Sequence, residues 1–220
     1  MNFFIGKSGK YLLAVCLLFL AAAAGFAQEE VRKPVIPAVK MVEKSEKVGV
    51  TRIIFKIPVG KKVVKVINLY GKEEEFDWKK ATVEGEKQYP EIVAKLLRNY
   101  GYDVIEDSDD LFGTGGSAKA RFQIAGVVTD MYISRVFSGY VGCCGGLFNS
   151  INAVTSMYMD IEWQIYDSIN DKIVLKKTTT GLYYDDKKIE DGEALFYGTF
   201  ENAFLQFMAM DEFVKVLGGK

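Results

Sequence analysis

The sequence contains no histidine, and this absence excludes more chemistry than any other feature of its composition. Without imidazole, Ser-His-Asp and Cys-His mechanisms, the usual zinc sites and histidine proton shuttles are all removed. Catalysis would have to use carboxylates, lysines, tyrosines or cysteines alone. The composition therefore favours a protein that is not an enzyme and needs no metal or other cofactor, with a role in binding or assembly.

Cysteine is also scarce: the chain has 3, and two of them are the adjacent Cys143 and Cys144. Neighbouring Cα atoms lie about 3.8 Å apart, less than the usual disulfide span, so a bond between these two would be strained and easily reduced. A thiol redox protein using this pair is one alternative function. No cation flanks the pair to stabilise a thiolate, which leaves buried thiols, an intermolecular bond or a tight structural ring as competing interpretations.

Basic residues are not in excess, because 28 lysines and arginines face 29 acidic residues. Proteins that bind nucleic acids usually carry a basic patch on one face or along one helix. Nothing in this sequence forms such a patch, so we expect no nucleic-acid partner.

The first 27 residues have the three parts of a secretory signal peptide. Two lysines near the start precede an apolar run over residues 11–24, and Gly25-Phe26-Ala27 supplies small residues at the cleavage-determining positions. The apolar run is too short to span a bilayer comfortably. Cys16 is preceded by Val15, where a lipid-attachment signal needs a small residue. We therefore predict cleavage after Ala27 and an exported protein that is periplasmic or associated with the outer membrane.

The rest of the chain predicts an extended tether over residues 28–49 and a single α+β domain over residues 50–220. Prolines and mixed charges mark the tether. The domain is expected to contain a mixed or antiparallel sheet of four to five strands with two packing helices. The expected strands are 51–57, 62–69, 102–105, 121–132, 157–166 and 172–180, and the expected helices are 90–100 and 193–217.

Several positions carry specific structural expectations. Gly101 is placed as a left-handed cap of the first helix, and Gly126 marks a bulge or a close backbone approach within its strand. The charged run 73–75 reads as a solvated loop that Phe76 and Trp78 pin to the core. The alternation of apolar and polar residues over 157–166 predicts a strand with one buried face, with Trp163 packing against Phe204 of the last helix.

Two short segments resemble ligand sites at first inspection. Residues 113–119 are glycine-rich but lack the spacing of a phosphate-binding loop, since Lys119 does not follow the last glycine directly. Residues 106–110 are acidic but lack the alternating oxygen ligands and central glycine of a calcium loop. A mobile hairpin loop and a capped turn are the preferred interpretations.

The segment 135–156 is the candidate interaction site, and we expect it to be a long glycine-rich loop. It contacts an envelope protein partner or a second copy, makes at most a peripheral membrane contact, or folds back over the sheet. Its candidate contact residues are Phe137, Tyr140, Cys143, Cys144, Leu147 and Phe148. A further alternative is a small-ligand-binding module in which the sheet presents Tyr158, Trp163 and Tyr166 on one concave face.

The order of the motifs resembles a known group of envelope proteins. The run YPEIVAKLLRNYGYDVI at 89–105 is followed by RFQIAGVVTD at 121–130, by the hairpin 159–181 and by the terminal helix. This order is similar to the periplasmic α+β domain of the CsgG-like curli secretion pores, the amino-terminal domain of TolB and the peptidoglycan-synthase activator lipoproteins. The resemblance implies a non-enzymatic envelope protein without catalytic residues. Unlike the pore formers, this chain offers only one candidate membrane hairpin, at 135–156.

Overall fold

The computed structural model describes residues 33–80, 83–84, 87–105, 120–140, 150–186 and 192–218. The chain separates into two compact units, Met1–Val31 and Arg32–Lys220, and all that follows concerns the second. The predicted signal peptide, the segments 106–110 and 113–119, and Cys143, Cys144, Leu147 and Phe148 lie outside the described residues.

The described residues form one mixed eight-stranded sheet with three helices, which confirms the expected α+β class with more strands and helices than predicted. The strands are β1 Val48–Phe55, β2 Lys62–Ile67, β3 Glu73–Asp77, β4 Val83–Glu84, β5 Val104–Ile105, β6 Phe122–Tyr140, β7 Ser150–Asp167 and β8 Lys172–Asp185. The helices are α2 Gln88–Asn99, α3 Gly192–Met208 and α4 Asp211–Leu217.

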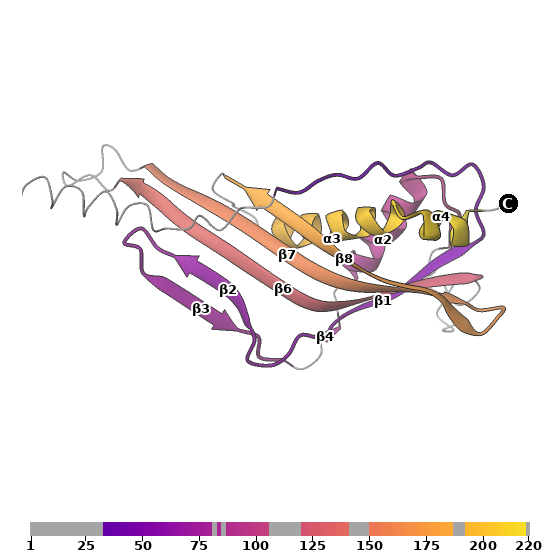
Figure 1. The fold of residues 1–220 in the computed structure, drawn as a ribbon, viewed down its shortest axis with the longest axis horizontal. Coiled ribbons are helices and arrows are strands. Elements are labelled where there is room, and N and C mark those ends of the chain that lie inside the picture. Colours follow the sequence, from indigo (N-terminus) through magenta and orange to yellow (C-terminus); the bar gives the residue numbers. More distant parts are fainter. Residues whose placement is uncertain are drawn as a thin grey trace, which may run out of the picture. The chain divides into compact units, whose positions relative to one another are not determined.

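The long strand β6 organises the sheet (Figure 1). One of its edges pairs with β7 in antiparallel register along its whole length, and β7 pairs in turn with β8. The other edge is shared by two parallel strands: β1 pairs with residues 122–128 and β2 with residues 133–136. The β6–β7 register shifts between Val128 and Asp130, where the neighbour of β6 on its other edge changes from β1 to β2. The antiparallel β3 extends the sheet beyond β2.

The core lies between one face of the sheet and the helices. On β7 the side chains of Met159, Ile161, Trp163 and Ile165 are fully buried, as the alternation predicted. The Trp163 indole packs on α3, with ring centroids 5.0 Å from Phe204, which confirms the expected contact. Its Nε1–H donates to Thr179 Oγ1 at 2.8 Å, so the one polar atom of the ring is paired.

Two glycines have the roles that the sequence predicted. Gly101 follows α2 with φ +89°, and a Cβ there would collide with the carbonyl oxygen of Val42. At Gly126 a Cβ would lie 2.9 Å from both Ile53 Cδ1 and Trp163 Cζ3. The Trp163 ring therefore reaches across β6 only because that position has no side chain.

The acidic run 73–75 is not a loop, which corrects the expectation. It forms the edge strand β3, because lysines of β2 neutralise its carboxylates across the ladder. Lys65 pairs with Glu73 at 3.1 Å. Phe76 is 52% exposed and does not pin this segment, whereas Trp78 is partly buried and stacks on Phe55 at 6.3 Å.

The single terminal helix expected over residues 193–217 is two helices, α3 and α4. Met210 between them has extended backbone, with φ −71° and ψ 135°, and this breaks the helix without interrupting its apolar spacing. The turn brings Phe213 back onto Phe207, with ring centroids 4.9 Å apart. Periodicity alone does not reveal such a break, because both helices bury the same kind of side chain.

Residues 33–47 run as an extended segment over the helices, and we call this segment the strap (Figure 1). The Val42 N–H donates to the Tyr100 carbonyl at 3.0 Å, and Asn202 Nδ2 on α3 donates to the Val35 carbonyl at 3.0 Å. At the start of the strap, the Lys33 ammonium lies 5.6 Å from the ring centroid of Tyr184 on β8.

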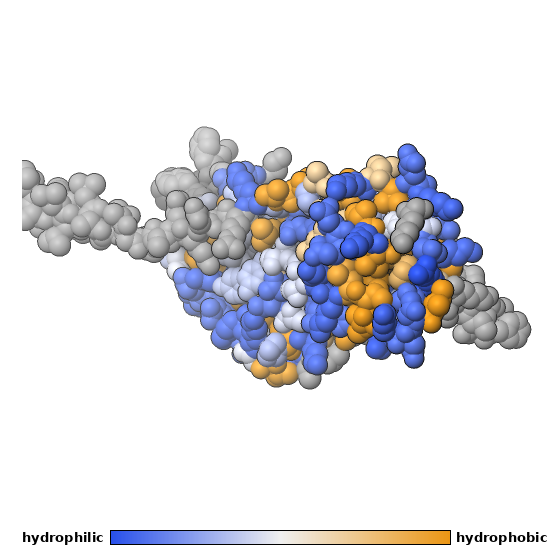
Figure 2. Space-filling model, turned by 45° about the vertical axis from the view of Figure 1, so that its right-hand side comes forward, coloured by the Kyte–Doolittle hydropathy of each residue, from blue (hydrophilic) through white to orange (hydrophobic). Residues whose placement is uncertain are grey.

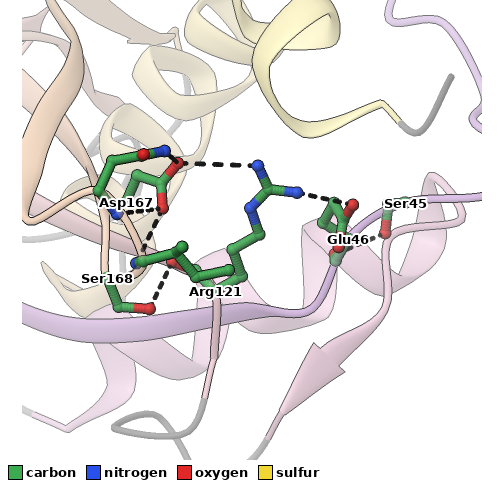
Figure 3. Close-up of polar contacts among 7 residues, drawn as sticks. Ser45, Glu46, Arg121, Asp167 and Ser168 are labelled. Atoms are coloured by element: carbon green, nitrogen blue, oxygen red, sulfur yellow. Dashed lines mark hydrogen bonds and ion pairs between the residues drawn. The ribbon is translucent and has the colours of Figure 1, made fainter.

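The end of the strap is tied to the sheet by the cluster in Figure 3. Arg121 donates to Glu46 at 2.8 Å and lies 3.8 Å from Asp167, which is 3% exposed. Burial alone would raise the pKa of the Asp167 carboxyl. Hydrogen bonds from Asn170 and Ile169, with the Arg121 charge, hold that pKa below its ordinary value. These contacts close the β7–β8 turn, so we assign the cluster a structural role.

Candidate functional site

The described parts of the segment 135–156, residues 135–140 and 150–156, are strands and not a loop, which corrects the sequence prediction. Strand β6 continues to Tyr140 and β7 begins at Ser150, and these two residues are opposite each other in the ladder. The β-branched and aromatic residues on either side of the glycine-rich stretch suit paired strands. The sequence analysis missed this pairing because it averaged the glycine-rich stretch between the two strands with the strands themselves.

The end of this hairpin extends beyond both of its neighbours. Strand β2 ends at Ile67, opposite Val136, and β8 ends at Asp185, opposite Thr155. Residues 137–140 and 150–153 therefore form a two-stranded ribbon, which we call the arm (Figure 1). Four residues of strand correspond to about 13 Å. A two-stranded ribbon is only marginally stable by itself in water.

The two faces of the hairpin differ at the base of the arm. Phe137 is half-buried and lies opposite Ala153, which is buried, on the face that also carries the core. Val136, 36% exposed, lies on the other face and is opposite Val154. We call this second face, which is opposite the helices, the outer face. Of the candidate contact residues, only Phe137 and Tyr140 lie within the described residues.

Cross-strand registers arrange the outer face into rows of different polarity. The row at the base of the arm is apolar and joins Ile67, Val136 and Val154 of three neighbouring strands. The next row has Ser134 opposite Ser156.

Two positions further from the arm, Tyr132 of β6 lies opposite Tyr158 of β7. Their rings stack with centroids 6.1 Å apart and planes inclined by 27°. Leu182 of β8 extends this aromatic row.

The row beyond the tyrosines is charged. Asp130 lies opposite Asp160, Lys61 Nζ lies 2.5 Å from Asp130 Oδ2, and Thr180 donates to Asp160 at 2.6 Å. The Tyr158 hydroxyl donates to Asp130 Oδ2 at 3.4 Å. Burial, followed by the charge of Asp130, raises the Tyr158 pKa to about 12. This hydroxyl is therefore a hydrogen-bond donor at neutral pH and cannot act as a base.

One carboxylate of the charged row is paired with a lysine. Lys61 already neutralises Asp130, and Asp130 Oδ1 is buried without a hydrogen-bond partner in the described part of the chain. Within that part, no group of three or more metal-ligating side chains occurs.

The register shift beside Asp130 is a bulge of the kind that redirects a strand, here from β1 to β2 as its neighbour.

The small-ligand alternative is not supported by the placement of its residues. Tyr158 and Tyr166 lie on the outer face of β7, whereas Trp163 lies on the opposite face and is fully buried under α3. The three side chains proposed to line one concave surface therefore do not meet.

A long run without charged residues marks the arm in the sequence, and the sequence analysis did not use it. Residues 136–159 include no Asp, Glu, Lys or Arg, although charged residues make up 26% of the chain. This charge-free run of 24 residues spans the whole arm and reaches back to the tyrosine row.

Figure 2 shows hydrophilic residues over much of the visible face, interrupted by groups of hydrophobic ones. No helix of the described segments is long and apolar enough to cross a membrane.

Comparison with known proteins assigns no family. No family model and no curated protein matches the sequence. Among solved structures, a Xanthomonas campestris protein of family DUF330 is similar, with 12% identity and a TM-score of 0.39, covering 81% of this chain and 90% of that one. The PelC dodecamer of Paraburkholderia phytofirmans has 14% identity and a TM-score of 0.32, covering 83% of this chain and 96% of its own.

A lipoprotein of Neisseria meningitidis has 11% identity and a TM-score of 0.32, covering 74% of this chain and 98% of its own. At such identities and TM-scores these likenesses decide nothing about function. The resemblance to the CsgG-like and TolB group stays a prediction.

Proposed function

We propose that this protein is a non-enzymatic component of the cell envelope that acts in interaction or assembly through its arm. The observation that carries the proposal is the register of the sheet: both strands of the arm continue past β2 and β8. Each strand of the arm has one edge without a neighbouring strand among the described residues. Unpaired strand edges are stabilised when a partner covers them.

The test replaces Phe137, Tyr140 and Phe148 with serine together. We expect a normal thermal unfolding transition but loss of self-association in light scattering, or loss of recovery with envelope fractions. The matched control replaces Ile169 and Ile173 with serine, since they are 72% and 51% exposed at the turn end of the β7–β8 hairpin. The control should associate as the wild type does.

Two results would contradict the proposal. Early unfolding of the triple variant would mean that these residues belong to the core. A folded variant that associates normally would place the contact elsewhere. Replacing Cys143 and Cys144 with serine in parallel tests the redox alternative, which predicts loss of function only in that variant.

A further inference from the structure

We propose that the strap is a latch that closes the free edge of β8 against pairing with a second copy of this chain. The proposal goes beyond the proposed function, because β8 ends at Asp185, opposite Thr155, before the arm begins. Three features carry it: the hydrogen bonds that α3 makes to the edge of β8, the residue through which the strap joins these bonds, and the sequence of the edge.

Strand β8 is an edge strand of the described sheet, in which it pairs with β7 alone. It has 14 residues, and a long unpaired edge is a template for another strand. Alternate residues of an antiparallel strand direct their backbone groups to opposite edges. At Thr180 and Leu182 these groups face away from β7, because they bond to side chains of α3.

Two side chains of α3 cap this edge. The Leu182 N–H donates to Asn202 Oδ1 at 3.0 Å, and Gln206 Nε2 donates to the Thr180 carbonyl at 2.8 Å. Gln206 Nε2 also donates to Asn202 Oδ1 at 3.1 Å, so the two caps support each other. A second strand would need the same backbone groups, so it cannot pair here while the caps are in place.

Gly181 allows α3 to come close enough to cap the edge. A Cβ at this position would collide with the Thr199 carbonyl oxygen and lie 2.9 Å from Ala203 Cβ. The Thr179 hydroxyl donates to the Ala203 carbonyl at 2.8 Å and fixes the helix on the strand. Any side chain at position 181 would therefore move α3, and the caps with it, away from β8.

The strap completes the hydrogen bonding of Asn202. Its Nδ2 donates to the Val35 carbonyl at 3.0 Å, while its Oδ1 accepts from Leu182 and Gln206. Asn202 is 6% exposed, so loss of the strap would leave its amide donor without this partner in a buried place. The strap therefore helps to hold the side chain that closes the edge.

The start of the strap is held by contacts at the surface. Val35 and Ile36 are 72% and 78% exposed, so their side chains bury little apolar area. The ion pair between Lys40 and Asp211 at 2.9 Å is also exposed, and such pairs contribute little to stability. Segments with few buried contacts open locally at less cost than the core. The strap can therefore leave α3 while the domain stays folded.

The sequence of the uncapped edge suits a second copy of itself. Antiparallel pairing of two β8 edges around Thr180 would place threonine opposite threonine at the symmetry axis. Lys176 of each copy would lie opposite Tyr184 of the other, and Thr178 opposite Leu182. Threonine pairs are favourable across strands, and over residues 175–185 no like charges would meet.

The experiment uses the full exported chain and replaces Asn202 with alanine. Exchange of the Leu182 amide hydrogen should accelerate about tenfold, the order expected for the loss of one hydrogen bond. The Tyr183 amide, which faces β7, should exchange as in the wild type. Trypsin should cut after Lys40 faster than in the wild type, because the strap is released. Light scattering should show a mass that approaches twice that of the wild type.

A proline on the edge identifies the surface that pairs. In the Asn202→Ala background, Thr178→Pro removes an N–H that faces away from β7, so it blocks edge pairing and leaves the β7–β8 ladder intact. The mass should return to the wild-type value. The matched control is Gln164→Ala, which removes an amide on the outer face of β7 that donates to Glu162 at 2.8 Å. It should leave amide exchange, cleavage and mass unchanged.

Thermal unfolding shows whether each variant folds. If Asn202→Ala does not, Gln206→Ala takes its place, since it uncaps the Thr180 carbonyl and should raise the mass in the same way. The inference is overturned if a folded uncapped variant keeps the wild-type mass, or if the proline does not reverse the rise. It also fails if Thr178→Pro alone abolishes association of the wild type, because the edge would then already be open. The serine variant of the arm tests the proposed function separately, since its residues lie outside β8.

Discussion

Replacing Phe204 with alanine tests whether the helical layer is held on the sheet as the structure indicates. The Phe204 ring is fully buried and contacts three other aromatic rings, with centroids 5.0 Å from Trp163, 6.2 Å from Phe213 and 6.3 Å from Phe207. Truncation leaves a cavity among these rings, which are anchored on three different elements and cannot all move in to fill it.

We expect Phe204→Ala to lower the free energy of unfolding by about 3–5 kcal/mol, the range for a buried phenylalanine. The loss includes edge-to-face contacts, which are worth about 0.5–1.5 kcal/mol each and are not additive. Urea denaturation followed by tryptophan fluorescence measures it, because Trp163 lies directly against the mutated ring.

The control is Phe76→Ala on the edge strand β3, where the ring is 52% exposed. It should cost less than about 1 kcal/mol, since little apolar area is lost from the interior. A loss below about 1 kcal/mol for Phe204→Ala as well would refute the packing of α3 on the sheet. Equal losses of several kcal/mol in both variants would show that the β3 region is buried by something further.

Three other predictions concern processing and protonation. Intact-mass measurement should find the exported chain beginning at Gln28; a chain retaining Met1, or one acylated at Cys16, contradicts this. Because the pKa of Asp167 lies below its ordinary 3.8, its contribution to stability is complete above that pH and is lost as the pH falls through the lowered pKa. Asp167→Asn should therefore flatten the acid limb of the stability profile, and an unchanged limb would refute the assignment. Ultraviolet titration should show Tyr102 and Tyr158 both ionising near pH 12, because burial raises both pKa values. Asp130→Asn should leave Tyr102 unchanged and lower the pKa of Tyr158 only partly, because burial is the main cause of its shift; a fall of the Tyr158 pKa to the ordinary value of 10.0 would make the Asp130 charge the main cause.

The local sequence determined those elements whose conformation follows from a few neighbouring residues. The alternation on β7 placed Trp163 on the buried face, and the glycine after α2 predicted the left-handed residue that the structure has at φ +89°. These signals act over a few residues, through side-chain direction and backbone sterics, so they can be read without knowing the partners.

Tertiary structure decided what depends on pairing between distant segments. The acidic β3 becomes a strand because lysines of β2 lie across from it, and the arm exists because residues on both sides of a glycine-rich stretch find each other. The outer face shows the same dependence. Tyr132, Tyr158 and Leu182 form a row only through the registers of three strands, and a shift of one residue would send each to the other face. Register is set by the packing of the whole buried face under the helices, and for that reason the candidate site was not visible in the sequence alone.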